Sequence, residues 1–193
     1  MAAEFIIRLY CGTIMAMSRE RHKSEVRPLD GEGLERLALF YAGRYAVTRA
    51  KLRQYLHRKL RERGWSGEGE PPVERLAERF AELGYVDDTA FAAARADALT
   101  RRGYGLRRVD QALRAAGIEQ EDGAGAREAA EAGAWAAALR FAERKRIGPF
   151  AQAQPDRPGR EKALAAMLRA GHPLGLARRL VAAVPGEVPD AED

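Results

Sequence analysis

Apolar residues recur along this chain at the three- and four-residue spacing of an amphipathic helix. The pattern predicts helical segments over residues 34–41, 52–60, 73–80, 91–98, 106–116, 135–142, 164–168 and 176–184. No stretch alternates apolar and polar residues as a half-buried strand does. Ala, Leu, Arg and Glu dominate the composition, and this balance also favours helix. We therefore expect an all-α fold.

Glycine marks the ends of these segments. Four predicted helices end in a glycine followed at once by a large apolar residue, at Gly64-Trp65, Gly84-Tyr85, Gly103-Tyr104 and Gly117-Ile118. Glycine adopts the left-handed conformation after a helix at little cost, and the next side chain can then fold back onto the last turn. A stop about every 20 residues corresponds to one helix plus a turn. The chain is therefore predicted to form elongated tandem repeats of short three-helix modules.

This punctuation divides the chain into five parts. Residues 1–29 are expected to form a disordered N-terminal extension, too short and too interrupted by charge to span a membrane. A two-helix module over residues 30–66 and a three-helix module over residues 67–118 follow. A third module of three helices covers residues 119–184 and carries an inserted Pro- and Gly-rich loop at 148–159. Residues 185–193 form an acidic tail.

Charge is distributed unevenly. The chain has 33 Lys and Arg against 28 Asp and Glu, and its basic residues concentrate at 44–63, 101–108 and 140–146, whereas residues 68–88 are acidic. A single basic cluster is often only a solvated helix face, but basic helices beside aromatic residues also suit a phosphate backbone or an acidic protein surface. Gly103 and Gly105 flank Tyr104, so the backbone of this turn can approach a partner closely. The candidate contact residues are Arg44, Arg49, Arg53, Lys59, Arg101, Arg102, Arg107 and Arg108.

The segment "GYVDDTAF" at 84–91 places two adjacent carboxylates between a glycine turn and a new helix. Asp87 and Asp88 could act in a metal-dependent phosphodiester hydrolase, but the usual two-metal clamp needs more ligands than one adjacent pair. An aspartate at this place accepts hydrogen bonds from free backbone N–H groups, so we interpret the pair as a helix cap. The three histidines lie far apart, the single cysteine is Cys11, and no phosphate-binding glycine loop is present. The sequence therefore predicts a protein without catalytic residues, metal or cofactor.

Two motifs carry a resemblance to a known family. "GYVDDTAFA" followed by "GYGLRRVDQALRAAGI" resembles RecX, the family of regulators of the RecA recombinase. Gly84, Tyr85, Asp87, Asp88, Phe91 and Ala92 match its first motif. The second motif is matched by Gly105, Val109, Leu113, Gly117 and Ile118. The likeness covers residues 34–118 well and is weaker over 125–184, where His172 stands at a usual phenylalanine.

The resemblance implies a cytoplasmic, monomeric, all-helical protein that is not an enzyme. It would bind the RecA filament on single-stranded DNA, limit strand exchange and ATP hydrolysis, and act in DNA repair and the SOS response. Gly84, Tyr85, Asp87, Asp88 and Phe91 would be structural. Contact with single-stranded DNA would be direct or through RecA. The alternative is a helical module that binds DNA directly, without RecA.

Overall fold

The computed structural model describes residues 27–190. In that range the chain forms nine α-helices and one short 3-10 helix. They are α2 (Gly31–Arg44), α3 (Arg49–Arg63), α4 (Val73–Glu82), α5 (Asp88–Arg101), α6 (Leu106–Ala115), α7 (Ala124–Ala132), α8 (Ala134–Lys145), η1 (Gly148–Phe150), α9 (Arg157–Arg169) and α10 (Leu174–Ala182). The extended backbone in this range pairs once, in an isolated bridge between Leu29 and Trp65. The prediction of an all-α fold is confirmed.

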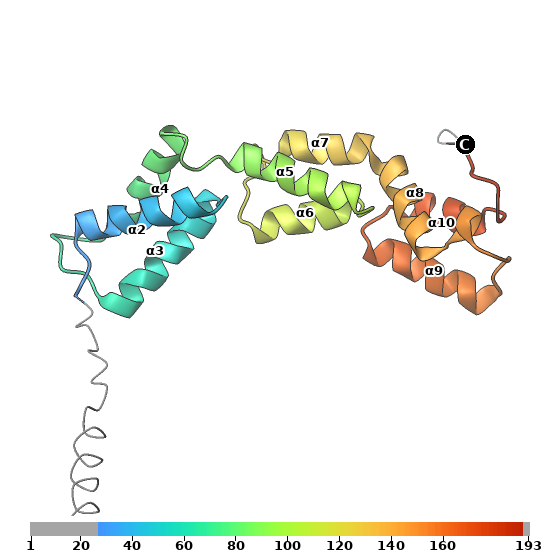
Figure 1. The fold of residues 1–193 in the computed structure, drawn as a ribbon, viewed down its shortest axis with the longest axis horizontal. Helices are drawn as coiled ribbons and strands as arrows, with labels where there is room; N and C mark the ends of the chain where they lie inside the picture. The colour runs from blue at the N-terminus through green and yellow to red at the C-terminus, as the bar shows by residue number, and fades with distance from the viewer. Residues whose placement is uncertain (1–26, 191–193) are drawn as a thin grey trace, which may run out of the picture.

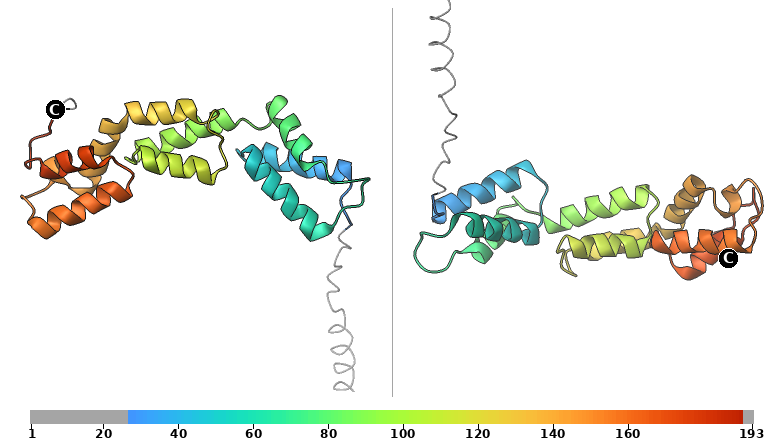
Figure 2. Two further views of the ribbon diagram at one scale, coloured as in Figure 1. Left: turned by 180° about the vertical axis from the view of Figure 1, so that it is seen from behind. Right: turned by 90° about the horizontal axis from the view of Figure 1, so that it is seen from below.

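The helices form three bundles that follow one another along the long axis (Figures 1 and 2). The first bundle is α2, α3 and α4, and its core includes Leu34, Leu52 and Phe80. The second is α5, α6 and α7, around Val109 and Leu113. A third core gathers side chains from α8, α9 and α10 (Phe141, Met167 and Leu180 among them). In the view of Figure 1, α4 and α7 lie along the upper edge, and α3, α6 and α9 along the lower edge.

The boundaries between bundles differ from the predicted module boundaries. Helix α4, assigned from the sequence to the second module, packs on α3 and buries Val73, Leu76 and Phe80 in the first core. Two helices alone cannot enclose these apolar faces, and the Gly- and Pro-rich segment 66–72 is a loop within the bundle. Residues 27–29, placed in the N-terminal extension, also belong here, since Leu29 is buried and its N–H donates to Gly64 O (3.0 Å). The rest of the predicted extension lies outside the described residues.

Helix α7 was not predicted. Its sequence, AGAREAAEA, contains no large apolar side chain, so it lacks the stripe that marked the other helices. It nevertheless completes the second core by burying Ala126 and Ala130. Arg127 fixes it to α6 through an ion pair with Asp110 (2.9 Å), and this hydrogen bond, with the help of Arg114, holds the pKa of Asp110 below its ordinary value.

The predicted loop at 148–159 is partly helical. Its first residues form η1, and its last three are the first turn of α9, capped by Asp156 and containing Pro158. Proline is tolerated there because the first N–H groups of a helix have no intrahelical partner. Gly148 has φ +57°, and a Cβ on it would lie 1.8 Å from Leu180 O, so only glycine fits against α10. The irregular segment is therefore shorter than expected and packed at its start.

The second and third bundles are joined at the turn after α5. A Cβ on Gly103 would lie 2.7 Å from the backbone nitrogen of Phe141, and one on Gly105 would lie 2.5 Å from Gly171 O. Gly105 N donates to Ala170 O (2.9 Å), so the two backbones are in direct contact. The prediction that this glycine turn approaches an external partner is therefore wrong. The close approach is to the chain's own third bundle.

His172 lies inside this contact between the second and third bundles, which we call the second joint. It is fully buried, its Nε2 lies 3.1 Å from Gly103 O, and its ring packs against Phe141. Burial lowers the pKa of His172 below its ordinary value, and the hydrogen bond to Gly103 offsets part of that effect. The histidine therefore performs the packing role expected of a phenylalanine and adds one hydrogen bond between the bundles.

Gly105→Ala tests the close backbone contact. The added methyl group must separate Gly105 from Gly171, and we expect the free energy of unfolding to fall by about 1–3 kcal/mol. Gly175→Ala is the matched control, because nothing lies within 4 Å of its Cβ position and alanine favours the helix. Urea unfolding of both variants measures the difference. Equal stability of the two variants would contradict the close contact.

The buried His172 predicts a pH dependence. In the unfolded chain this histidine binds a proton near its ordinary pKa of 6.5, whereas the folded chain resists protonation. Stability should therefore be full above that pKa and fall on acidification, by up to about 1.4 kcal/mol per pH unit. His172→Phe should remove this slope between about pH 7 and 5.5, whatever its effect on stability at neutral pH. An unchanged slope in urea titrations would show that His172 is not its source.

Candidate partner-binding groove

The two aspartates of the "VDD" segment have different roles. Asp87 is the N-cap of α5, and its Oδ1 accepts the N–H of Ala90 (2.8 Å). Asp88 is buried and turns to the first bundle, where its Oδ1 accepts the backbone N–H of Arg49 (2.9 Å) and its Oδ2 the Nε of Arg49 (3.2 Å). One carboxylate thus caps its own helix, and the other caps the N-terminus of α3.

Gly84, Tyr85 and Phe91 flank the pair. Gly84 has φ +75° and ends α4, so Tyr85 N can donate back to Phe80 O (2.9 Å). The Tyr85 ring lies 5.3 Å from the Phe80 ring but remains 53% exposed. Phe91 packs against the second core beneath the ammonium group of Lys51. The chain thus turns from the first bundle into the second without a flexible linker.

The N-terminus of α3 is held by the second bundle. Thr48 is fully buried; its Oγ1 donates to Ala116 O (2.7 Å) and accepts the N–H of Lys51 as the helix cap. The next residue, Arg49, forms ion pairs with Asp88, Asp122 and Glu78. Gly117 has φ +73°, and a Cβ on it would lie 2.3 Å from that of Ala50. These contacts define the first joint.

Arg49 is the centre of this joint. Its side chain is 20% exposed and that of Asp88 only 4%. Burial lowers the pKa of Arg49. The hydrogen bond to Asp88 and the charges of Asp122 and Asp88 raise it by more than burial lowers it, so the net pKa lies above its ordinary value. The guanidinium is therefore permanently charged and has carboxylates from α4, α5 and the loop before α7 around it.

A groove lies next to the first joint. Its volume is about 1230 Å³, and its walls come from the end of α2, the start of α3, the 84–91 segment and the facing sides of α5 and α6. It therefore runs from the first bundle along the second. Its charged lining side chains are five cations and one carboxylate: Arg44, Lys51, Arg95, Arg102, Arg108 and Asp87. Because the Asp87 carboxylate already caps α5, the groove presents mainly positive charge.

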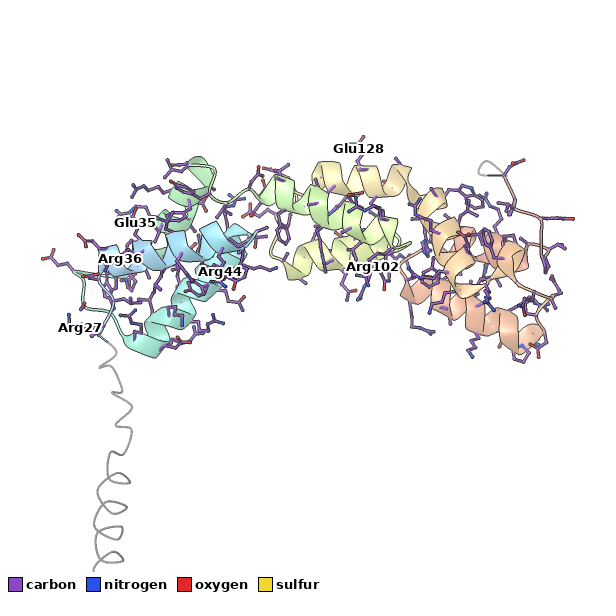
Figure 3. All side chains as sticks on the ribbon, viewed as in Figure 1. Arg27, Glu35, Arg36, Arg44, Arg102 and Glu128 are labelled. Carbon is purple, nitrogen blue, oxygen red and sulfur yellow. The ribbon has the colours of Figure 1, made fainter. Side chains whose placement is uncertain are left out.

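Aromatic rings accompany these cations. Tyr45 and Tyr85 are each 53% exposed in the groove wall, and Tyr104 lines it further along. The guanidinium of Arg44 lies 5.9 Å from the Tyr45 ring centroid, and that of Arg102 lies 5.7 Å from Tyr104. Figure 3 labels Arg44 in the first bundle and Arg102 in the second. The groove therefore combines cationic groups with aromatic faces.

The predicted contact residues separate into three groups. Arg44, Arg102 and Arg108 line the groove. Arg49 and Arg53 do not, because Arg49 holds the joint and Arg53 forms ion pairs with Glu74 and Glu78 of α4. The remaining three lie elsewhere on the surface: Lys59 is paired with Glu62, Arg101 is paired with Asp97, and Arg107 is exposed.

Two cations of the groove were not among the predicted contacts. Lys51 belongs to the basic segment of α3, and Arg95 stands alone between the basic clusters. The sequence carries a signal for Arg95, since Phe91, Arg95 and Arg102 lie four and seven residues apart and so fall on one face of α5 and its C-cap. A search for charge clusters along the chain misses it, because its neighbours in space are distant in sequence.

No metal-binding group of side chains accompanies the groove in the described part of the chain. Within residues 27–190, no three His, Cys, Asp or Glu side chains lie close enough together to hold a metal ion. The carboxylates of Asp87 and Asp88 are occupied by backbone N–H groups and by Arg49. No helix in the same range is long and apolar enough to span a membrane.

Separate alanine substitutions distinguish the two aspartates. Asp87→Ala removes a local cap and should cost about 1 kcal/mol of unfolding free energy. Asp88→Ala leaves the Arg49 N–H and guanidinium without their buried acceptor and should cost roughly 2–3 kcal/mol. Guanidinium chloride would screen the ion pairs, so urea unfolding is the suitable measurement. Equal costs would contradict the bridging role of Asp88.

Comparison with known proteins relates the chain to characterised sequences. No protein-family profile matches it. It is 32% identical over 174 residues to "Regulatory protein RecX" of Myxococcus xanthus, covering 84% of this chain and 91% of that protein. The protein of the same name from Agrobacterium fabrum is 27% identical over 157 residues, which cover 79% of this chain and 84% of the relative. With matches of this extent, the chain belongs to the RecX family of regulatory proteins.

Proposed function

We propose that this protein is a non-enzymatic regulator that binds the RecA filament on single-stranded DNA and limits strand exchange and ATP hydrolysis. The groove along the second bundle is its contact surface. The observation that carries this proposal is the concentration of five cations against one occupied carboxylate in a single groove beside two exposed tyrosines. Family membership supports the regulatory role.

The charge of the groove suits an anionic partner. A concave surface lined by one sign of charge focuses the field and raises the rate of encounter with a partner of opposite charge. Two cations of α3, Arg49 and Arg53, are neutralised by α4, because they pair with Glu74 and Glu78. By contrast, none of the five groove cations forms an ion pair within residues 27–190, so they are available to an acidic protein surface or to phosphate.

Direct binding of single-stranded DNA is the second candidate function. The exposed rings of Tyr45 and Tyr85 favour it, because nucleic acid bases stack on aromatic side chains beside a cationic groove. Such binding would not need RecA, and its affinity would fall steeply as the salt concentration rises. The slope of log affinity against log salt would become smaller by about one unit for each phosphate contact that a substitution removes.

Two double variants separate the groove from the rest of the basic surface. Arg102→Glu with Arg108→Glu reverses two groove cations, whereas Arg101→Glu with Arg107→Glu reverses their sequence neighbours outside it. All four side chains are exposed, so each substitution should change stability by only about 0.5 kcal/mol. In a RecA ATPase assay on single-stranded DNA, the groove variant should lose inhibition by at least about tenfold in concentration, and the neighbouring variant should retain most of it.

The outcomes are distinguishable. If the groove variant also loses binding to DNA alone, with a reduced salt slope, the contact is to phosphate. Unchanged DNA binding with lost inhibition places the contact on RecA. Equal inhibition by both variants and the parent would show that the groove is not the contact surface.

A further inference from the structure

A second cavity lies in the third bundle, away from the groove. It has a volume of about 580 Å³, within the range typical of small-ligand sites. Its walls are the end of α8 with the start of η1, the irregular segment 151–155, and one face of α9. The bundle is the right-hand part of the molecule in Figure 1.

The charged side chains that line this cavity are all cationic. Lys145 and Arg146 come from the end of α8, and Lys162 and Arg169 lie seven residues apart on one face of α9. None of the four has a carboxylate within 4 Å in the part of the chain that the structure describes. Four cations around one cavity repel one another unless an anion lies between them.

The rest of the lining is uncharged and, apart from Gln152, apolar or small. Ile147 and Val181 are buried, and Ala163 and Ala166 lie between the two α9 cations on the same face. No aromatic side chain lines the cavity, which distinguishes it from the groove and from the stacking surfaces that bind single-stranded nucleic acid. The lining therefore suits a compact polyanion with a small uncharged body.

Arg146 has an unusual backbone conformation. Its φ is +54°, and it is the single non-glycine residue with positive φ within residues 27–190. Eight glycines of the same range have positive φ, several of them after helices, where glycine costs least. At the end of α8 the chain instead has an arginine, which places a cation on the rim of the cavity.

We propose that this cavity binds a small oligophosphate, inorganic or carried by a nucleoside, through Lys145, Arg146, Lys162 and Arg169. The phosphates contact the cations at the rim, and an attached body contacts the apolar wall of Ala163, Ala166 and Val181. The site is separate from the groove and does not depend on the function proposed for it.

Arg146→Gly is the informative substitution. A purely structural arginine would be needed for stability, whereas glycine fits this conformation better. The variant should therefore melt at the same temperature as the parent or higher, and bind the oligophosphate at least about tenfold more weakly. Lys162→Gln, in the middle of α9, should weaken binding to a similar degree. Arg36→Gln removes an exposed cation of the first bundle and is the matched control.

Isothermal titration calorimetry of the full chain at about 0.15 M salt, where unspecific attraction is screened, measures binding. Tripolyphosphate and ATP are the probes. Saturable one-to-one binding that Arg36→Gln preserves supports the site. Equal affinity for the two probes would show that the phosphates alone are recognised. Tighter binding of ATP would show that the nucleoside also makes a contact. Absence of saturable binding, equal binding by all variants, or binding of a single-stranded oligonucleotide but of neither probe would overturn the proposal.

Discussion

The shape of this protein depends on the interaction between the Arg49 guanidinium and the buried Asp88 carboxylate. Arg49 belongs to the first bundle, and its carboxylate partners come from α4, α5 and the loop before α7. Because Asp88 also accepts the Arg49 backbone N–H, one carboxylate fixes both the start of α3 and the side chain of Arg49. The groove exists because this joint holds the end of α2 and the start of α3 against the open face of α5 and α6.

The two joints use different physics. The first is polar and charged, with Thr48 and Arg49 reaching into the second bundle. The second relies on backbone contact at Gly103, Gly105 and Gly171, where side chains are excluded. Arg140 and Arg144 support it by donating to the carbonyls of Thr100 and Arg102 at the end of α5, where cations also complement the helix dipole. Salt should therefore affect the first joint more than the second.

Local features of this fold could be predicted from the sequence, and distant partnerships could not. The apolar stripes predicted most of the helices, and the glycines after them have positive φ at Gly64, Gly84, Gly103 and Gly117. Helix α7 was missed because its alanine and glutamate residues form no stripe of large apolar side chains. Helix α4 was assigned to the wrong bundle because a Gly- and Pro-rich loop has the same sequence character within a bundle as between bundles. Arg49 was expected to contact a partner because it belongs to a basic cluster. Its carboxylate partners lie 29, 39 and 73 residues away along the chain, so the sequence does not show that its charge is already paired.

The most direct test of the first joint is a distance measurement across it. Spin labels at Arg36→Cys on α2 and Glu128→Cys on α7, two exposed sites marked in Figure 3, report how the first and second bundles sit relative to each other, once Cys11 is replaced by serine. Double electron–electron resonance should give one narrow distance distribution in this background and a broad one when Arg49→Gln is added. A broad distribution in the starting protein, or an unchanged narrow one with Arg49→Gln, would contradict the role assigned to Arg49.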